Sequence, residues 1–328
     1  MFIKDGKTHI LIDFDINKIE EDLPNGIYKL EVSRNVNFYE VDFGNLPPLE
    51  GQEYKRIFDK VVKREASILL SGKSGFGKTL LMKHIAKKLS EKYPVIIVGR
   101  ENVDALKTIA NRLNKAVFLF DEFEKNYIDI RNPEDYEESM QYSQQMLLTL
   151  LDGTDKKHIF ILTANEEQKI SEYFFNRPGR IRYVFRFEKV PADIIESKPF
   201  NKAEKEILHT LNHTGLINFD ILNFLLEEKE AGYGVEESLQ DLGYDLSALK
   251  KIAGYKADKL VYQDIDEKEE YNITNLELDA SGSIFIEFID KRGRLDNIST
   301  SDYKIEKVGG MPIIRLGKYY TITFKKRS

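Results

Sequence analysis

The sequence contains no cysteine among its 328 residues. Disulfide bonds, zinc sites built on thiolates and cysteine nucleophiles are therefore excluded. Histidine is also scarce: the whole chain has five, and none of them stands in the HExxH spacing of a helical zinc site. We expect these histidines to serve in packing or at the surface.

Long apolar runs are missing as well. No stretch is long enough to span a bilayer, and the segment Met1–Gly6 lacks the pattern of a signal peptide. We therefore expect a cytoplasmic protein without membrane contact. Positive charge is not in excess either, since the formal net charge is −6. This balance argues against a generally basic nucleic-acid coat, although it leaves room for a local basic channel.

The length and composition fit two or three domains. Hydrophobic residues make up 41% of the chain and charged residues 32%, enough for a packed core under a strongly solvated surface. The pattern divides the chain into four parts: a β-rich segment over 1–48, strands alternating with helices over 49–198, a helical part over 199–258 and a β-rich part over 259–328. The alternation predicts an α/β fold with a parallel sheet. The two β-rich ends could pack on each other as one module.

The alternating part has five apolar runs of strand type, at residues 67–71, 94–98, 116–120, 158–164 and 183–187. A helix is predicted over 52–64 and a long one over 134–151. In the helical part, the spacing of apolar residues predicts helices over 202–211, 219–228, 235–242 and 246–252.

A glycine-rich loop follows the first of these strands. Its sequence is Gly72-Lys73-Ser74-Gly75-Phe76-Gly77-Lys78-Thr79, which fits G-x-x-x-x-G-K-[ST] at every fixed position. Glycines let backbone N–H groups curl around phosphate oxygens, and the following helix adds its N-terminal dipole. Lys78 can reach the β- and γ-phosphates of ATP, and the Thr79 hydroxyl can ligate Mg²⁺. A glycine turn that matches by chance is the alternative, but the strand–loop–helix context favours phosphate binding.

Polar residues end the next two central strands. Asp121 and Glu122 follow the strand 116–120, and Asn165 follows the strand 158–164. Ligands bind at the carboxyl ends of parallel strands, so Asp121 would hold Mg²⁺ through water and Glu122 would act as a general base toward the attacking water. Asn165 could orient that water. Each residue alone is an ordinary strand end, and their order behind the glycine-rich loop favours the functional interpretation.

Two arginines, Arg177 and Arg180, flank a Pro-Gly turn. A guanidinium supplied to the γ-phosphate stabilises the charge of the transition state, and it can come from a neighbouring subunit. The alternative is a solvated basic turn.

Taken together, these segments resemble the AAA+ ATPases, and the stretch Arg177-Pro178-Gly179-Arg180-Ile181 is most similar to the AAA branch. The resemblance covers about residues 50–255, including a small helical lid on a P-loop NTPase core. It implies that Gly72 to Leu80 bind the nucleotide, that Lys78 and Thr79 are the Walker A pair, that Asp121 and Glu122 are the Walker B pair, that Asn165 is sensor 1, and that Arg177 and Arg180 are candidate arginine fingers. It also implies a homo-oligomeric ring, often a hexamer, with ATP at subunit interfaces.

The sequence departs from the family pattern in three places. Arg182 stands where the AAA pattern usually has Asp, and no sensor-2 arginine is identifiable in the helical part. Protein-threading members carry an aromatic pore loop after the second strand, whereas Gly99 to Asp104 contain no aromatic residue. This argues against threading of a single chain. Tyr127 and Ile128 could line a pore instead, with a plain surface loop as the alternative.

The resemblance leaves the biological role open. The leading hypothesis is remodelling or translocation of an unknown protein client, with the β-rich ends as binding modules. A nucleic-acid loader or helicase-type motor is the alternative, with scattered positive charge at Arg100, Lys307, Arg315 and Lys325–Arg327, and it is not favoured because no basic-aromatic cluster is present. A slow ATP-dependent assembly switch and a fold that binds nucleotide without hydrolysis are the remaining possibilities.

Overall fold

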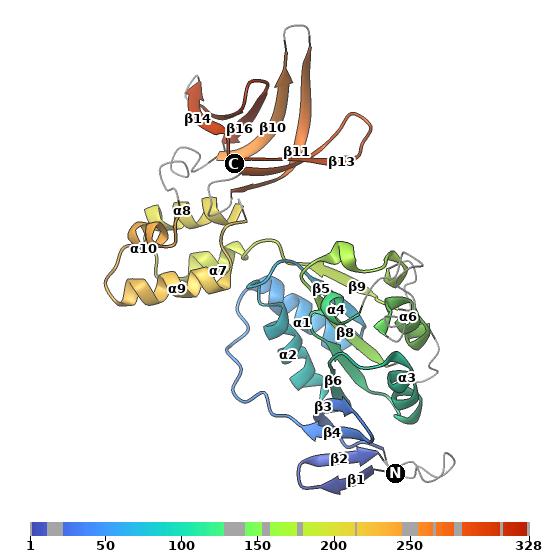
Figure 1. The fold of residues 1–328 in the computed structure, drawn as a ribbon. Coiled ribbons are helices and arrows are strands. Elements are labelled where there is room, and N and C mark those ends of the chain that lie inside the picture. Colours follow the sequence, from blue (N-terminus) through green and yellow to red (C-terminus); the bar gives the residue numbers. More distant parts are fainter. Residues whose placement is uncertain are drawn as a thin grey trace. The chain divides into compact units, whose positions relative to one another are not determined.

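The computed structural model describes residues 2–11, 22–127, 142–152, 158–175, 180–213, 215–244, 255–264, 267–278, 284–308 and 311–326. The chain divides into two compact units, Met1–Phe187 and Glu188–Ser328. Figure 1 traces the chain from its N-terminal strands to its C-terminal sheet. The division falls at Phe187, whereas the sequence pattern predicts the end of the α/β core at residue 198.

Unit 1 is built on one sheet. Its strands among the described residues are β1 (Phe2–Asp5), β2 (Thr8–Leu11), β3 (Gly26–Val32), β4 (Val36–Glu40), β5 (Ile68–Ser71), β6 (Pro94–Val98), β7 (Val117–Phe120), β8 (Ile159–Ala164) and β9 (Tyr183–Arg186). They lie in the order β1-β2-β4-β3-β6-β7-β8-β5-β9. The pairs from β3 to β9 are all parallel, which confirms the predicted α/β class.

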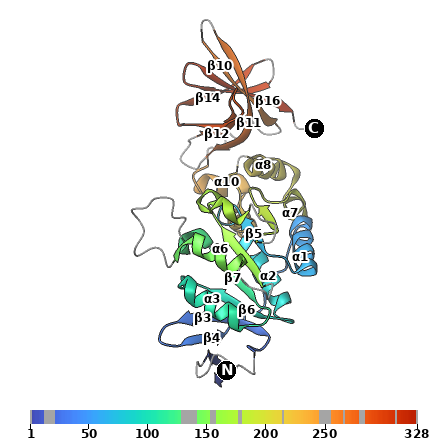
Figure 2. The same ribbon diagram turned by 90° about the vertical axis from the view of Figure 1, so that its right-hand side faces the viewer.

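Helices flank the central strands. They are α1 (Gln52–Arg64), α2 (Lys78–Leu89), α3 (Val103–Arg112), the short α4 (Phe123–Asn126) and α6 (Gln144–Asp152), with 3₁₀ turns at Glu167–Lys169 and Glu172–Phe174. Figures 1 and 2 show α1 and α2 on one side of the sheet and α3 and α6 on the other. Every residue of β5, β7 and β8 is buried, as expected for central strands covered on both faces.

The four N-terminal strands, β1 to β4, extend this sheet. Strand β3 pairs in parallel with β6, with Ile27 opposite Val95, and β4, β2 and β1 follow outward as antiparallel neighbours. The N-terminal strands therefore lie in unit 1, whereas the C-terminal strands form a different sheet in unit 2. This differs from the idea that the two β-rich ends form one module.

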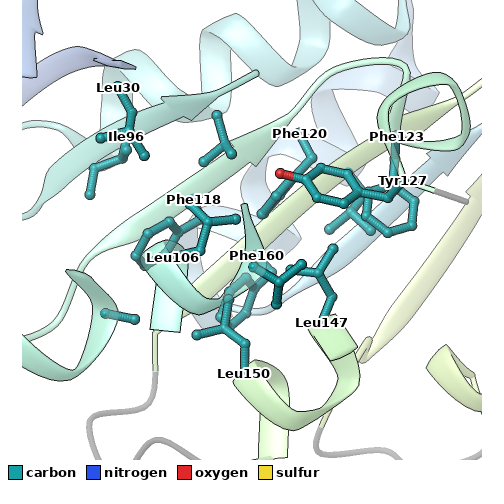
Figure 3. Close-up of a cluster of buried hydrophobic side chains, with 14 of the residues drawn as sticks. Leu30, Ile96, Leu106, Phe118, Phe120, Phe123, Tyr127, Leu147, Leu150 and Phe160 are labelled. Carbon is teal, nitrogen blue, oxygen red and sulfur yellow. The ribbon is translucent and has the colours of Figure 1, made fainter. Parts of the chain in front are cut away.

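A cluster of buried side chains fills the space between the sheet and its α3–α6 side. Figure 3 draws 14 of them and labels Leu30, Ile96, Leu106, Phe118, Phe120, Phe123, Tyr127, Leu147, Leu150 and Phe160. The rings of Phe118 and Phe160 stack at 5.5 Å between centroids. Burying each such side chain contributes about 1.5–3 kcal/mol, so this cluster fixes β7 and β8, whose carboxyl ends carry Asp121 and Asn165.

Tyr127 belongs to this cluster. Its side chain is fully buried, it stacks on Phe123 at 5.4 Å, and its hydroxyl bonds to Gly99 O at 3.2 Å and to Glu101 O at 3.0 Å. The prediction that Tyr127 lines a pore is therefore wrong, because a buried ring has no surface to offer. Ile128 lies outside the described residues, as does most of the helix predicted over 134–151, of which α6 is the described part.

Unit 2 begins with helices. They are α7 (Ala192–Ser197), α8 (Lys202–His213), α9 (Phe219–Glu230) and α10 (Val235–Asp241); the further helix predicted over 246–252 lies outside the described residues. The buried Asn212 amide donates to Val190 O at 2.7 Å and accepts from Val190 N at 2.8 Å. This two-point contact fixes the chain entering unit 2 against α8.

The described strands of unit 2 form an antiparallel sheet. Its strands are β10 (Tyr255–Gln263), β11 (Lys268–Leu278), β12 (Ile284–Ile289), β13 (Leu295–Thr300), β14 (Tyr303–Val308), β15 (Met311–Leu316) and β16 (Tyr320–Lys326). They lie in the order β13-β12-β11-β10-β16-β15-β14. Across the described parts of both units, no helix combines the length and apolarity needed to cross a membrane.

Candidate functional site

The glycine-rich loop connects β5 to α2. Its first residue, Gly72, has φ 135° and lies so close to Phe187 that a Cβ would sit 2.0 Å from the Phe187 carbonyl oxygen. The Gly72 N–H donates to Ala164 O at 3.1 Å, and the Phe187 N–H donates to Ser71 O at 2.7 Å. The start of the loop is thus held between the ends of β8 and β9, and only glycine fits there.

Tyr54 of α1 holds the other end of the loop. Its hydroxyl donates to Phe76 O at 2.8 Å, and its ring lies 5.1 Å from the Phe187 ring. Burial raises the pKa of the Tyr54 hydroxyl, so this group remains a donor at any ordinary pH. Between these anchors, Lys73 and Ser74 are exposed. Gly77, with φ 70°, precedes the first turn of α2, which contains Lys78, Thr79 and Leu80.

Lys78 is folded back over the loop. Its ammonium donates to Gly72 O, to Lys73 O at 2.7 Å and to Asn165 Oδ1 at 2.9 Å. The side chain is 6% exposed. Burial lowers the pKa of Lys78, and the carboxylates of Glu124, Asp121 and Glu122 oppose that shift. A buried ammonium group beside the loop can form charge-assisted hydrogen bonds with the oxygens of a polyphosphate.

Asp121 lies beside the start of α2. The Thr79 hydroxyl donates to Asp121 Oδ1 at 3.1 Å. Thr163 of β8 also donates to Asp121 Oδ1, and it accepts from the Glu122 N–H at 2.9 Å. Within the described residues, no group of three His, Cys, Asp or Glu side chains could hold a metal. Thr79 and Asp121 offer hard oxygens, which fit Mg²⁺ when phosphates and water supply the remaining ligands.

Glu122 follows directly in a left-handed conformation, with φ 47°. Its Oε1 accepts from the Lys125 ammonium at 2.7 Å and from Asn165 Nδ2 at 3.0 Å. The hydrogen bond from Lys125 is the main cause that lowers the pKa of the Glu122 carboxyl. The carboxylate is therefore ionised at neutral pH and held beside Asn165.

Asn165 connects the two halves of the site. One end of its amide meets Lys78 and the other meets Glu122, while its backbone N–H donates to Glu124 Oε1 at 2.9 Å. The structure thus brings together Lys78, Asn165 and Glu122 in one network, with Thr79 and Asp121 beside it.

The two arginines are not part of this network among the described residues. Arg177 lies outside them. Arg180 is 8% exposed. Its guanidinium donates to both carboxylate oxygens of Asp152, from Nε at 2.7 Å, and to Tyr173 O at 2.6 Å. The Arg180 side chain is buried and hydrogen-bonded to partners in the same chain, and this differs from the exposed position expected of a finger.

Sequence reasoning missed several residues of the site, namely Tyr54, Glu124, Lys125 and Thr163. Two of them, Thr163 and Glu124, have sequence features that could have identified them as site residues. Thr163 is a hydroxyl inside the apolar run of a buried central strand, where an unpaired polar group is costly. Glu124 adds a third carboxylate to the run Asp121-Glu122-Phe123-Glu124. Tyr54 and Lys125 gave no sign, because nothing local distinguishes them from other residues of a helix.

Comparison with known proteins places residues 68–189 in the family described as "ATPase family associated with various cellular activities (AAA)". The chain is 31% identical over 141 residues to a protein named cell division cycle ATPase of Plasmodium falciparum. The aligned residues make up 39% of this chain and 11% of that protein. This chain is 27% identical over 192 residues to the peroxisomal ATPase pex6 of Schizosaccharomyces pombe. Here the aligned residues make up 52% of this chain and 20% of that protein. The chain thus spans a fifth or less of the length of these relatives.

Among solved structures, a variant of RuvB from Thermotoga maritima aligns with a TM-score of 0.40 and 14% identity, over 62% of this chain and 76% of that chain. The matched family segment contains the glycine-rich loop, the Asp-Glu strand end and Asn165. The segment 68–189, which contains Lys78, Glu122 and Asn165, thus matches the AAA ATPase family.

Proposed function

We propose that this chain is an ATP hydrolase that works as a homo-oligomeric ring on a protein partner. The observation that carries the proposal is the network of Lys78, Asn165 and Glu122 at the carboxyl ends of parallel strands. In it a polar amide joins a phosphate-binding cation to an ionised carboxylate by one hydrogen bond on each side, beside a loop shaped for phosphates.

In this proposal the residues divide the work. The loop from Gly72 to Leu80 binds the phosphates, and Lys78 exchanges its loop carbonyls for phosphate oxygens. Thr79 and Asp121 hold Mg²⁺, which would neutralise charge on the phosphates. Glu122 accepts the proton of the attacking water, and Asn165 orients that water. The Glu122 contact with Lys125 must open or shift for the carboxylate to reach the water.

Glu122→Gln tests the chemistry, because it keeps the shape and removes the base. We expect steady-state ATP hydrolysis to fall by about a hundredfold or more, with ATP affinity nearly unchanged. Glu166→Gln is a matched control, since Glu166 is an exposed carboxylate paired with Lys169 and lies one residue beyond Asn165. If Glu122→Gln hydrolyses ATP at the wild-type rate, the assignment of the base is refuted.

We propose Arg177 as the finger that acts on the neighbouring subunit, because Arg180 is bound to Asp152 within its own subunit. A ring, with a hexamer favoured by the family resemblance, predicts that specific activity rises with subunit concentration. Arg177→Ala would leave ATP binding nearly intact and lower hydrolysis by roughly a thousandfold. A rate independent of concentration in a monomer would refute action between subunits.

The role in the cell follows from the family resemblance: remodelling or translocation of a protein client in the cytoplasm, with the sheet β10–β16 as a client or adaptor module. Stimulation of ATP hydrolysis by single- or double-stranded DNA, lost at high salt, would instead support the nucleic-acid motor. A rate indifferent to DNA would favour the protein partner.

A further inference from the structure

Glu124 is a buried carboxylate with an unusual hydrogen-bond balance. It lies on the short helix α4 and is 9% exposed. Its Oε1 accepts from the Asn165 N–H at 2.9 Å, whereas its Oε2 is buried with no hydrogen-bond partner. Burying a carboxyl oxygen without a hydrogen-bond partner costs free energy that an apolar side chain would avoid. A group retained at such a cost calls for a functional explanation.

The short helix α4, which carries Glu124, is anchored by aromatic packing. Phe123 is 1% exposed and packs on Phe120, Tyr127 and Phe174 at ring-centroid distances of 5.9, 5.4 and 5.3 Å. Figure 3 shows the rings of Phe120, Phe123 and Tyr127 packed together. Because α4 begins directly after Glu122, the same packing fixes both carboxylates relative to β7.

Glu124 connects α4 to Asn165, the residue that follows β8. Its hydrogen bond fixes the backbone of Asn165, and therefore the point from which the Asn165 side chain starts. In that side chain, Oδ1 accepts a hydrogen bond from Lys78 Nζ at 2.9 Å, and Nδ2 donates one to Glu122 Oε1 at 3.0 Å. A primary amide can serve both partners only from a narrow range of positions, because its acceptor and donor are fixed relative to each other.

We propose that Glu124 is a positioning residue for ATP hydrolysis, which fixes Asn165 so that its amide aligns Lys78 with Glu122. This inference rests on the proposed function, and it assigns to Glu124 no contact with the substrate. It distinguishes Glu124 from Glu122, which stands two residues earlier in the chain and acts as the base.

Two variants separate the hydrogen bond from the charge. Glu124→Leu removes the acceptor at similar volume, and we expect kcat to fall roughly 10–100-fold with KM for ATP changed by less than about threefold, the pattern of a lost transition-state interaction. Glu124→Gln keeps an acceptor for the Asn165 N–H, and we expect it to recover most of the lost kcat. The control Glu166→Leu removes an exposed carboxylate next to Asn165 and leaves kcat unchanged.

A double-mutant cycle with Asn165→Ala tests whether Glu124 acts through Asn165. If it does, Glu124→Leu has no further effect on kcat once the Asn165 side chain is gone. Multiplicative losses in the double variant, or a wild-type kcat in folded Glu124→Leu, would overturn the proposal. Should the leucine variant not fold, Glu124→Asp replaces it, because it shortens the reach by one methylene and keeps the charge.

Amide hydrogen exchange gives a readout that does not depend on turnover. We expect the peptide containing Asn165 to exchange faster in Glu124→Leu than in wild type, and at the wild-type rate in Glu124→Gln. If wild type hydrolyses no ATP, the proposed function fails, while this exchange pattern still supports the positioning contact. Unchanged exchange in Glu124→Leu overturns the positioning role whether or not the protein hydrolyses ATP.

Discussion

Gly72 is the position at which the smallest change should have the largest effect. Its φ of 135° lies in a region that L side chains rarely adopt, and a Cβ would meet Phe187 O at 2.0 Å and Phe187 C at 2.8 Å. The obstacle is backbone, and Phe187 is itself tied to Ser71 by a hydrogen bond of 2.7 Å. Gly72→Ala therefore cannot be accommodated by rotating a side chain.

The magnitude follows from two contributions. A carbon and a carbonyl oxygen approach to about 3.3–3.6 Å, so the two segments must separate by more than about 1 Å. The backbone conformation costs about 1–3 kcal/mol for a residue other than glycine, and overpacking costs about 1–3 kcal/mol. The sum, about 2–6 kcal/mol, is a large part of the roughly 5–15 kcal/mol that stabilises a folded domain.

The strain in Gly72→Ala can be relieved by unfolding or by distorting the loop. Urea unfolding followed by circular dichroism detects the first, and binding of a fluorescent ATP analogue detects the second. Since each 1.4 kcal/mol is a factor of ten in affinity, even about 2 kcal/mol of distortion weakens ATP binding about thirtyfold.

Gly99→Ala is the matched control, because a Cβ on Gly99 meets nothing within 4 Å. We expect it to change the free energy of unfolding by less than about 0.5 kcal/mol and to leave ATP binding intact. A Gly72→Ala protein that unfolds at the wild-type urea midpoint and binds ATP within about threefold of wild type would refute the reasoning.

Two further predictions concern buried polar contacts. Thr163→Val removes the hydroxyl that joins Asp121 to the Glu122 N–H, and we expect a loss of about 1–3 kcal/mol in urea unfolding; a change below about 0.5 kcal/mol would contradict it. Glu65→Gln removes a carboxylate whose pKa is lowered chiefly by its hydrogen bond from Lys115. The stability from Glu65 is present above its ordinary pKa of about 4.5 and lost as pH falls through the lowered pKa. Wild type should therefore exceed Glu65→Gln in unfolding free energy at pH 7, and the difference should vanish in acid; a constant difference would contradict the pairing.

The sequence alone determined the features whose residues are contiguous. The glycine-rich loop, the Asp-Glu strand end and Asn165 could be predicted because each follows an apolar run, and parallel strands bring their carboxyl ends to one edge. The helices α8, α9 and α10 were predictable from the same local spacing. In these places propensity, pattern and motif agree.

The tertiary structure decided what depends on contacts distant in sequence. Tyr54 reaches Phe76 across 22 residues, Asp121 meets Thr163 across 42, and Arg180 meets Asp152 across 28. No local pattern encodes such pairs, since each side chain alone fits an ordinary surface or core role. Packing of α4 buries Tyr127, and hydrogen bonding commits Arg180, because burial and pairing are properties of the whole fold. The sequence thus determined which chemical groups the site contains, and the fold determined which residues hold them in place.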